Sequence, residues 1–262
     1  MNQHINPENL YSLDIPNYNT ITDNNNDNEI INYFWAPNKL LIEKLELLLN
    51  KSNINDKIID VGCGEGNAIF PKATHILGLS LKINPNNLQF INFDLDFDKF
   101  IQNDKYFNFI YCRHTLEDIQ NPQNAFAELT RVSKQGYIET PSPLVELTKG
   151  SGLSEIRGYP HHRYIVWSDL KTNTLHFLPK YPIVELLEFD KNMTQKLIHI
   201  LNNYSVYWNN YYIWDESNPP KIIVYRNEVN FNILTDYDIL VAEAINKSID
   251  YTNHFIQKIK NL

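Results

Sequence analysis

One short segment constrains the fold of this 262-residue chain more than any other, because an apolar run in it stops at three closely spaced glycines. The segment reads Ile58-Ile59-Asp60-Val61-Gly62-Cys63-Gly64-Glu65-Gly66. The apolar residues predict a buried β-strand, and the glycines predict a turn whose backbone can approach a ligand closely. Ligands of parallel sheets bind beyond the carboxyl ends of the strands, so we expect a binding site at this turn.

The spacing of the glycines narrows the choice of ligand. They follow the pattern G-x-G-x-G, whereas a dinucleotide-binding turn has the pattern G-x-G-x-x-G. This difference disfavours a nicotinamide-dependent oxidoreductase. Asp60, two residues before the first glycine, suits a cationic amino group, so we expect a nucleoside that carries an amino acid.

Strand-like and helical segments alternate through the first half of the chain. Strands are expected at Lys57–Val61, Ile76–Leu79, Leu88–Phe93, Phe107–Cys112 and Gly136–Glu139, with helices at residues 37–50 and at Asn124–Val132. This alternation is typical of a parallel sheet in an α/β fold.

The second half is rich in turn residues after Pro141, which indicates an elaboration on the core and not a separate domain. Its expected elements are two strands at Arg163–Asp169 and Thr174–Lys180, a helix at Pro182–Asn203 interrupted near Asp190, an antiparallel pair at Tyr204–Trp214 and Lys221–Tyr225, and a helix at Asp236–Leu262. Apolar residues lie on one face of the last helix, which either packs on the body or forms a dimer contact.

The composition is that of an ordinary globular protein, with 43% hydrophobic and 21% charged residues. No apolar stretch approaches the length of about 18 residues that a membrane span needs, and the N-terminus shows no secretory signal. The two cysteines, Cys63 and Cys112, lie in apolar, strand-like surroundings and indicate free thiols of a reducing compartment. We therefore expect a cytoplasmic protein.

Four motifs occur in order between Lys57 and Thr140. They are Asp60-Val-Gly-Cys-Gly-Glu-Gly66, Leu88-Gln-Phe-Ile-Asn-Phe-Asp94-Leu95, Tyr111-Cys-Arg-His114-Thr-Leu-Glu117-Asp118-Ile and Arg131-Val-Ser-Lys-Gln-Gly136-Tyr-Ile-Glu139. Together they resemble the class I S-adenosylmethionine (SAM)-dependent methyltransferases, especially the small-molecule, type 11-like branch. The resemblance implies a Rossmann-like α/β fold with a sheet of seven mostly parallel strands in the order 3-2-1-4-5-7-6. It also implies helices on both faces, an insertion after the fifth strand and a C-terminal helix.

The resemblance further implies which residues bind SAM. The matching positions are Asp60, Gly62, Gly64, Gly66, Ser80, Leu81, Asp94, Leu95 and Arg113. Asp60 and the glycines would surround the methionine end, and Asp94 would contact the adenine amino group. Ser80 stands where the family usually has an acid that bridges both ribose hydroxyls, and serine offers a single uncharged oxygen.

The methyl acceptor would lie against the loops beyond the fourth and fifth strands and against the insertion. Candidate proton acceptors are His114, His161 and His162, since an imidazole can accept a proton at neutral pH. Candidate substrate contacts are Tyr159, Arg163 and Glu139. These residues could instead have structural roles. The paired histidines would then form hydrogen bonds with the backbone of a turn, and Arg163 would form an ion pair with Glu139 or Glu146. No metal is expected, although Asp118 and Glu117 with His161 offer an alternative site for Mg²⁺.

We divide the chain into four segments of a single compact domain. They are an N-terminal arm and helix at residues 1–50, a SAM-binding core at 51–142, a substrate-side insertion at 143–203, and the last strands and C-terminal helix at 204–262. The core would carry the cofactor contacts, and the insertion would carry much of the acceptor side.

The functional prediction is SAM-dependent O-methyl transfer to a small polar acceptor, such as a sugar or glycan-precursor hydroxyl. One alternative is a degenerate methyltransferase fold that acts as a binding or scaffold protein, for which Ser80 is the main support. Another is an RNA methyltransferase, which the net charge of −8 and the lack of a basic stripe disfavour. We therefore expect a small-molecule substrate, no membrane or nucleic-acid partner, and a homodimer only if the C-terminal helix forms a contact.

Overall fold

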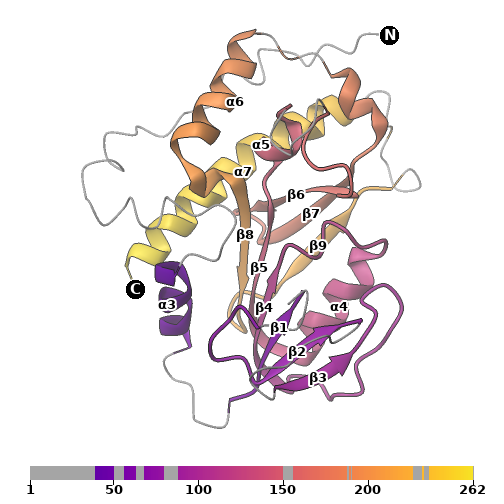
Figure 1. The fold of residues 1–262 in the computed structure, drawn as a ribbon, viewed down its shortest axis with the longest axis vertical. Helices are drawn as coiled ribbons and strands as arrows, with labels where there is room; N and C mark the ends of the chain where they lie inside the picture. The colour runs from indigo at the N-terminus through magenta and orange to yellow at the C-terminus, as the bar shows by residue number, and fades with distance from the viewer. Residues whose placement is uncertain are drawn as a thin grey trace.

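A six-stranded sheet forms the centre of the computed structural model, with the strand order β3-β2-β1-β4-β5-β8 (Figure 1). The structure describes residues 39–49, 56–62, 68–79, 88–149, 156–187, 189, 191–226, 232 and 236–261. The strands of this sheet are β1 (Ile58–Val61), β2 (His75–Gly78), β3 (Gln89–Asn92), β4 (Phe107–Arg113), β5 (Ser133–Pro141) and β8 (Asn209–Trp214). The first five run parallel, and β8 runs antiparallel to β5.

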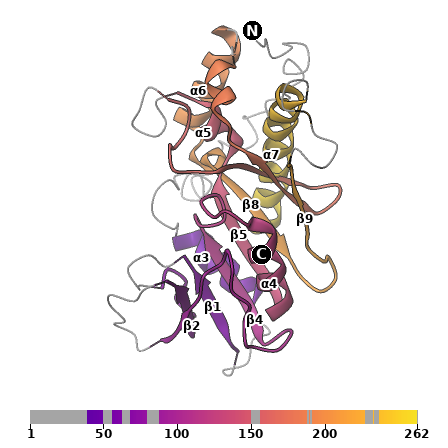
Figure 2. The same cartoon turned by 90° about the vertical axis from the view of Figure 1, so that its right-hand side faces the viewer.

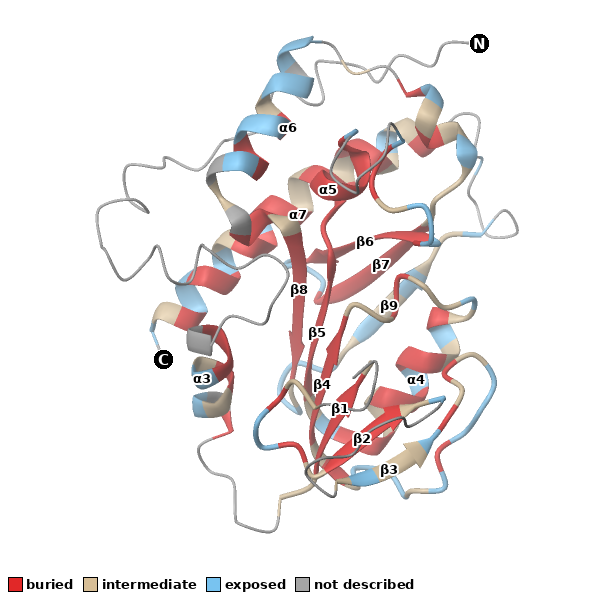
Figure 3. Ribbon diagram, viewed as in Figure 1, coloured by how far each residue is buried: buried red, intermediate tan, exposed pale blue. Residues whose placement is uncertain are grey.

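The central strands are apolar because both faces of the sheet are covered. Every residue of β1 is buried, and so is every residue of β4 except Asn108. The edge strand β3 has no buried residue. Figure 3 shows the same gradient, with buried residues concentrated in the middle of the sheet. Near-continuous apolar runs are typical of parallel strands. The mostly parallel α/β fold predicted from the alternation of strands and helices is confirmed.

The expected strand count and order are wrong in part. Among the described residues the central sheet has six strands and not seven, and the order 3-2-1-4-5 is followed by β8 alone. A separate three-stranded sheet contains β6 (Tyr164–Asp169), β7 (Thr174–Pro179) and β9 (Lys221–Val224). In it β6 and β7 form an antiparallel hairpin as expected, and β9 pairs with β7 in parallel.

The expected antiparallel pairing of Tyr204–Trp214 with Lys221–Tyr225 is also wrong. The first part of that segment is a 3₁₀-helix, η3 (Ser205–Trp208), and only the rest is a strand. Every residue of β8 is buried, so both of its faces need cover that a two-stranded ribbon does not supply. The chain therefore places β8 against β5 in one sheet and β9 against β7 in the other.

Helices cover both faces of the central sheet, as expected. They are α3 (Lys39–Leu48), α4 (Pro122–Val132), α5 (Pro143–Leu147), α6 (Lys191–Asn203) and α7 (Tyr237–Lys260), with a further 3₁₀-helix η2 (Pro182–Leu186) before α6. Tyr211 and Trp214 point to opposite faces of β8 because they are three positions apart and side chains alternate between the faces of a strand. Phe255 of α7 stacks on Tyr211 with 4.4 Å between ring centroids, whereas Phe126 of α4 lies 6.4 Å from the Trp214 ring. Figure 2 shows α7 and α4 at different levels along the sheet.

The C-terminal helix α7 buries one apolar face on the body of the protein. Its buried residues include Val241, Ile245, Ile249, Ile256 and Ile259, at the spacing of an amphipathic helix. The packing alternative for this helix is therefore confirmed, and the dimer contact stays a prediction. None of the helices in the described part of the chain combines the length and the apolar character needed to span a bilayer.

We expect Gly136→Ala to destabilise the fold. Gly136 lies opposite Trp214 in the β5–β8 register, and a Cβ atom on it would come within 2.2 Å of the indole ring. The overpacking should lower the free energy of unfolding by about 1–3 kcal/mol in urea titrations. Lys134→Ala, at an exposed position of the same strand, is the control and should change little. An unchanged urea midpoint in Gly136→Ala would contradict the observed register.

Candidate active site

The parallel strands bring their carboxyl ends to one edge of the central sheet, where ligands of such sheets bind. Gly62 follows β1, Asp94 follows β3, and His114 follows β4 directly. Glu139 lies close to the end of β5. Residues from four different strands are therefore gathered at one edge, as the sequence predicts.

Asp60 is buried at the end of β1 and uses its two carboxylate oxygens differently. Oδ2 accepts hydrogen bonds from the amides of Ile69 and Phe70, at 2.6 and 2.8 Å, and so attaches these two residues to the end of β1. Oδ1 is also buried, and it has no hydrogen-bond partner among the described residues. Burial raises the pKa of Asp60 to about 6, although the two backbone hydrogen bonds act to lower it. One oxygen of this carboxylate is therefore structural, and the other has no partner in the part of the chain that the structure describes.

Gly62 has a left-handed backbone with a φ of +84°. A Cβ at this position would lie 1.8 Å from the hydroxyl of Thr115 in the loop after β4. Only glycine allows this approach, which packs the turn after β1 against the turn after β4. The predicted cofactor residues Gly64, Gly66, Ser80 and Leu81 lie outside the described residues.

Asp94 begins a tight turn after β3. Its Oδ1 accepts from the amide of Asp96 at 2.9 Å, and its own amide donates to Oδ2 of Asp98 at 2.7 Å. Asp94 is half-buried, while the neighbouring Leu95 is buried. Both predicted adenine contacts therefore lie at the same edge of the sheet as Asp60, and their contact with a nucleoside stays a prediction.

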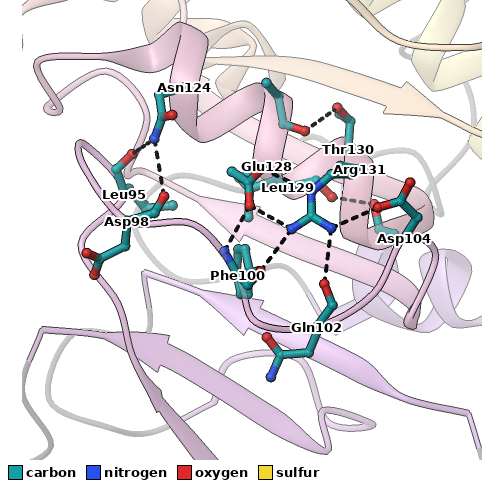
Figure 4. Close-up of polar contacts among 12 residues, drawn as sticks. Leu95, Asp98, Phe100, Gln102, Asp104, Asn124, Glu128, Leu129, Thr130 and Arg131 are labelled. Carbon is teal, nitrogen blue, oxygen red and sulfur yellow. Dashed lines mark hydrogen bonds and ion pairs between the residues drawn. The ribbon is translucent and has the colours of Figure 1, made fainter.

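Helix α4 holds the rest of this loop in place (Figure 4). The side-chain amide of Asn124 donates to the carbonyls of Leu95 and Asp98, at 3.2 and 3.4 Å. In the last turn of the helix, Arg131 donates to the carbonyls of Phe100 and Gln102 and to the carboxylates of Asp104 and Glu128. The turn at Asp94 is thus supported by side chains that belong to a helix of the core.

Arg113 and Glu139 lie opposite each other on β4 and β5 and form a buried ion pair. The Arg113 Nε donates to Oε1 of Glu139 at 2.9 Å, and the Tyr137 hydroxyl donates to Oε2. Burial alone would raise the pKa of Glu139, but the His114 ring and the Arg113 guanidinium outweigh it and lower the pKa. Arg113, predicted as a cofactor contact, and Glu139, predicted as a substrate contact, are here partners of each other.

His114 is held in a strained backbone conformation at the end of β4. Its φ of 47° is uncommon for a residue other than glycine, and such strain is often found at functional sites. The ring is 28% exposed, with Nε2 at 3.1 Å from Oδ1 of Asn209 and 3.6 Å from Oε1 of Glu139. Because these two neighbours are hydrogen-bond acceptors, Nε2 carries the proton and Nδ1 presents its lone pair.

The side chain of Glu117 is enclosed but unpaired. Neither of its carboxylate oxygens has a hydrogen-bond partner in the part of the chain that the structure describes. Burial raises the pKa of Glu117 well above its usual range, and the charges of Asp118 and Glu146 add to the effect. Oε1 lies 4.0 Å from Nδ1 of His114. Burial therefore favours the protonated form of Glu117, whose Oε1 faces Nδ1 of His114.

Two loops distant in sequence are joined beside Glu117. Its carbonyl accepts from the amides of Arg163 and Tyr164, at 2.8 and 3.2 Å. Nε of Arg163 donates to the carbonyl of Asp118 at 2.8 Å, and the Tyr164 hydroxyl donates to the carbonyl of Gln120 at 2.9 Å. Arg163 therefore pairs with neither Glu139 nor Glu146, and its hydrogen bonds attach the insertion to the core.

Glu146 on α5 organises the histidine pair. Its Oε2 accepts from Nζ of Lys180 at 2.6 Å, and its Oε1 lies 2.6 Å from Nδ1 of His162. Lys180 also donates to the carbonyl of Tyr159, whose ring centroid lies 4.7 Å from that of His162. His162 is buried and fixed, whereas His161 is exposed. Sequence reasoning missed Lys180, since a lysine after a strand carries no signal until its buried partner is known.

The methyltransferase domain family matches residues 32–179, which is just over half of the chain. The chain belongs to this family. The resemblance predicted from the four motifs is therefore confirmed, and with it SAM as the cofactor that this fold takes. Comparison with curated proteins finds no match.

Solved structures give distant likenesses. A SAM-dependent methyltransferase from Mesorhizobium loti is 18% identical, with a TM-score of 0.30 over 40% of this chain and 56% of its own. A second, from Aquifex aeolicus, is 18% identical with a TM-score of 0.29 over 41% and 69%. Coclaurine N-methyltransferase, bound to N-methylheliamine and SAH, is 15% identical with a TM-score of 0.29 over 39% and 35%. The match spans about half the length of several such structures, and these likenesses say nothing about the acceptor.

We expect Glu146→Leu to leave Lys180 as a buried cation without its counter-charge. The loss in the free energy of unfolding should be about 3–5 kcal/mol in urea titrations. The double variant Glu146→Leu/Lys180→Met removes both charges and should recover part of that loss. Glu146→Leu/Lys149→Met, which alters an exposed lysine instead, is the matched control and should recover none. Equal stability of the two double variants would show that the Lys180–Glu146 pair is not coupled.

Proposed function

We propose that this chain transfers a methyl group from SAM to a small polar acceptor, by O-methylation of a sugar or glycan-precursor hydroxyl. The observation that carries the proposal is the buried Oδ1 of Asp60, which has no hydrogen-bond partner within the described ranges, beside a left-handed glycine at the carboxyl edge of a parallel sheet. Membership of the methyltransferase domain family supports it. We also propose that the core at residues 51–142 binds SAM and that the insertion at residues 143–203 contacts the acceptor.

The residues at the sheet edge fit the cofactor in charge and in shape. An unpaired buried carboxylate oxygen is costly unless a ligand satisfies it, and the amino group of a bound methionine moiety would do so. Gly62 lets the end of β1 pack closely on Thr115 after β4, and the turn at Asp94 and Leu95 offers a half-buried carboxylate to an adenine amino group. When bound, SAM supplies a methyl group on a positively charged sulfur.

His114 and Glu117 together suit a hydroxyl acceptor. The 4.0 Å between Nδ1 and Oε1 is too long for a direct hydrogen bond, but an oxygen atom between them could contact both. The neutral Glu117 would donate to that oxygen, and Nδ1 of His114 would accept its proton as the new O–CH₃ bond forms and the S–CH₃ bond breaks. Asn209 and Glu139 behind the ring would stabilise the imidazolium.

The acceptor itself is best sought directly. Incubation of the protein with SAM and a panel of sugar nucleotides, followed by mass spectrometry, should show a mass gain of one methyl group on one member of the panel. The rival proposal, a scaffold protein without catalysis, rests on Ser80 in place of the usual acid. Calorimetry separates the two, because a scaffold that has lost the cofactor would give no saturable heat even at millimolar SAM.

We expect SAM affinity to depend on the ionisation of Asp60. The pKa of about 6 means that the carboxylate is charged at pH 7.5 and largely protonated at pH 5. The affinity should therefore fall about tenfold between these two pH values in calorimetry. Asp60→Asn should weaken binding by about 10- to 100-fold at pH 7.5 and abolish the pH dependence, without lowering the free energy of unfolding. Wild-type affinity in Asp60→Asn would refute the cofactor site.

We expect His114→Asn to lower kcat by about 10²- to 10⁴-fold, as the loss of a general base would. Asparagine tolerates the left-handed backbone of this position, so the fold should persist. The dissociation constant for SAM should stay within about twofold, because the imidazole acts on the acceptor. His254→Asn, at an exposed position of α7, is the matched control. A kcat close to that of the wild type would place the base elsewhere, at His162 or His161.

A further inference from the structure

Three potential metal ligands meet next to the proposed acceptor site. Asp118, His161 and His162 each offer one ligand atom, and these atoms lie within 4.8 Å of one another. Asp118 belongs to the loop after β4, and the histidines belong to the segment before β6. The three residues come from the two loops that the Glu117 and Asp118 carbonyls join by hydrogen bonds.

The turn before β6 brings two consecutive histidines to the same side. The amide of His162 donates to the carbonyl of Tyr159 at 3.3 Å, and the chain reverses there. The rings of His161 and His162 consequently lie 4.4 Å apart between centroids, at 75° to each other. In an extended strand, consecutive side chains would point in opposite directions. Both imidazoles can therefore face one point.

His162 is already oriented as metal-binding histidines are. Its side chain is only 5% exposed, Nδ1 lies 2.6 Å from the Glu146 carboxylate, and Nε2 lies 4.0 Å from Oδ1 of Asp118. A carboxylate behind the far ring nitrogen is the usual support of a histidine ligand, because it fixes the tautomer and the ring orientation. Lys180 holds that carboxylate in place from the other side.

Oδ1 of Asp118 supplies an independent sign of a missing ligand. This atom is buried and has no hydrogen-bond partner among the described residues, although the rest of the side chain is partly exposed. An unpaired buried carboxylate oxygen is costly, and a cation would satisfy it. The hydrogen bonds within the two loops do not involve this oxygen.

We propose that Asp118, His161 and His162 bind one divalent transition-metal ion of the zinc type. Two imidazole nitrogens and one carboxylate oxygen favour Zn²⁺ or Co²⁺ over Mg²⁺, which prefers oxygen ligands. Ligand atoms on one such ion lie about 3.3 Å apart, so the pair at 4.0 Å needs a shift of under about 1 Å, and the exposed His161 ring is able to move. Glu117, considered from the sequence as a ligand, lies outside this group because its enclosed carboxylate faces His114.

The position of the site suggests what the ion does. Three protein ligands leave a coordination position open, as in catalytic zinc sites. Asp118 directly follows Glu117, so an acceptor oxygen held near Glu117 and His114 would lie close to that open position. In this part the inference rests on the proposed function: the ion would bind an oxygen of the acceptor and favour the loss of its proton. Binding of the ion does not depend on methyl transfer.

The test is a titration of the full-length, metal-free protein with CoCl₂ in the absence of SAM, followed by visible absorption. ZnCl₂ is titrated in parallel by calorimetry. We expect a saturable site that millimolar MgCl₂ does not displace. His161→Ala and Asp118→Asn should each weaken Co²⁺ binding by about tenfold or more, while unfolding temperatures stay close to the wild type. His254→Ala, which removes an exposed histidine on α7, should bind as the wild type does.

Absence of saturable Co²⁺ absorption, or unchanged affinity in both His161→Ala and Asp118→Asn, would overturn the metal site. SAM calorimetry on the same metal-free protein keeps the two proposals apart, because the cofactor contacts lie at Asp60 and Asp94 and not in this group. A protein that binds Co²⁺ through these residues but not SAM would retain the metal site and lose the proposed methyl transfer. A protein that binds SAM but not Co²⁺ would retain the proposed methyl transfer and lose the metal site.

Discussion

The buried Arg113–Glu139 ion pair forms only in one register of β4 against β5, and that register also sets the position of the candidate site. The two residues lie opposite each other on β4 and β5, and both are buried. A slip of one residue would move each side chain to the other face of the sheet and leave a buried charge unpaired, which costs several kcal/mol. The correct register therefore stabilises the core and also places His114, the next residue, at the edge where ligands bind.

Three enclosed acids near this edge differ in their neighbours. Glu139 has a cation and two hydrogen-bond donors beside it, and its pKa is lowered. Glu117 has no partner among the described residues, and burial raises its pKa well above the usual range. Glu146 accepts from Lys180 and supports His162. Carboxyl groups of one type thus have different surroundings: Glu139 is the counter-ion of Arg113, Glu146 supports His162, and Glu117 is the donor in the function proposed above.

The proposed acceptor side of the site lies where the insertion joins the core. The carbonyls of Glu117 and Asp118 accept from Arg163 and Tyr164, residues more than forty positions later in the chain. The cofactor side depends on local features instead, such as the strand that ends at Gly62 and the turn that begins at Asp94. This difference explains why family membership identifies the cofactor and leaves the acceptor to be found by experiment.

Local pattern was sufficient to predict much of this protein. The alternation of apolar runs with helices predicted β1 to β5 and a parallel sheet, whereas the resemblance to the methyltransferases implied the order 3-2-1-4-5 and the place of Asp94. Asp60 and His114 were expected at one edge because parallel strands share their carboxyl edge. Only the tertiary structure decided that β8 leaves its expected partner β9, that Arg163 binds backbone carbonyls, and that Lys180 meets Glu146. The pattern of apolar residues in a segment indicates how much of that segment is buried. Which segment packs against it depends on residues far away in the chain.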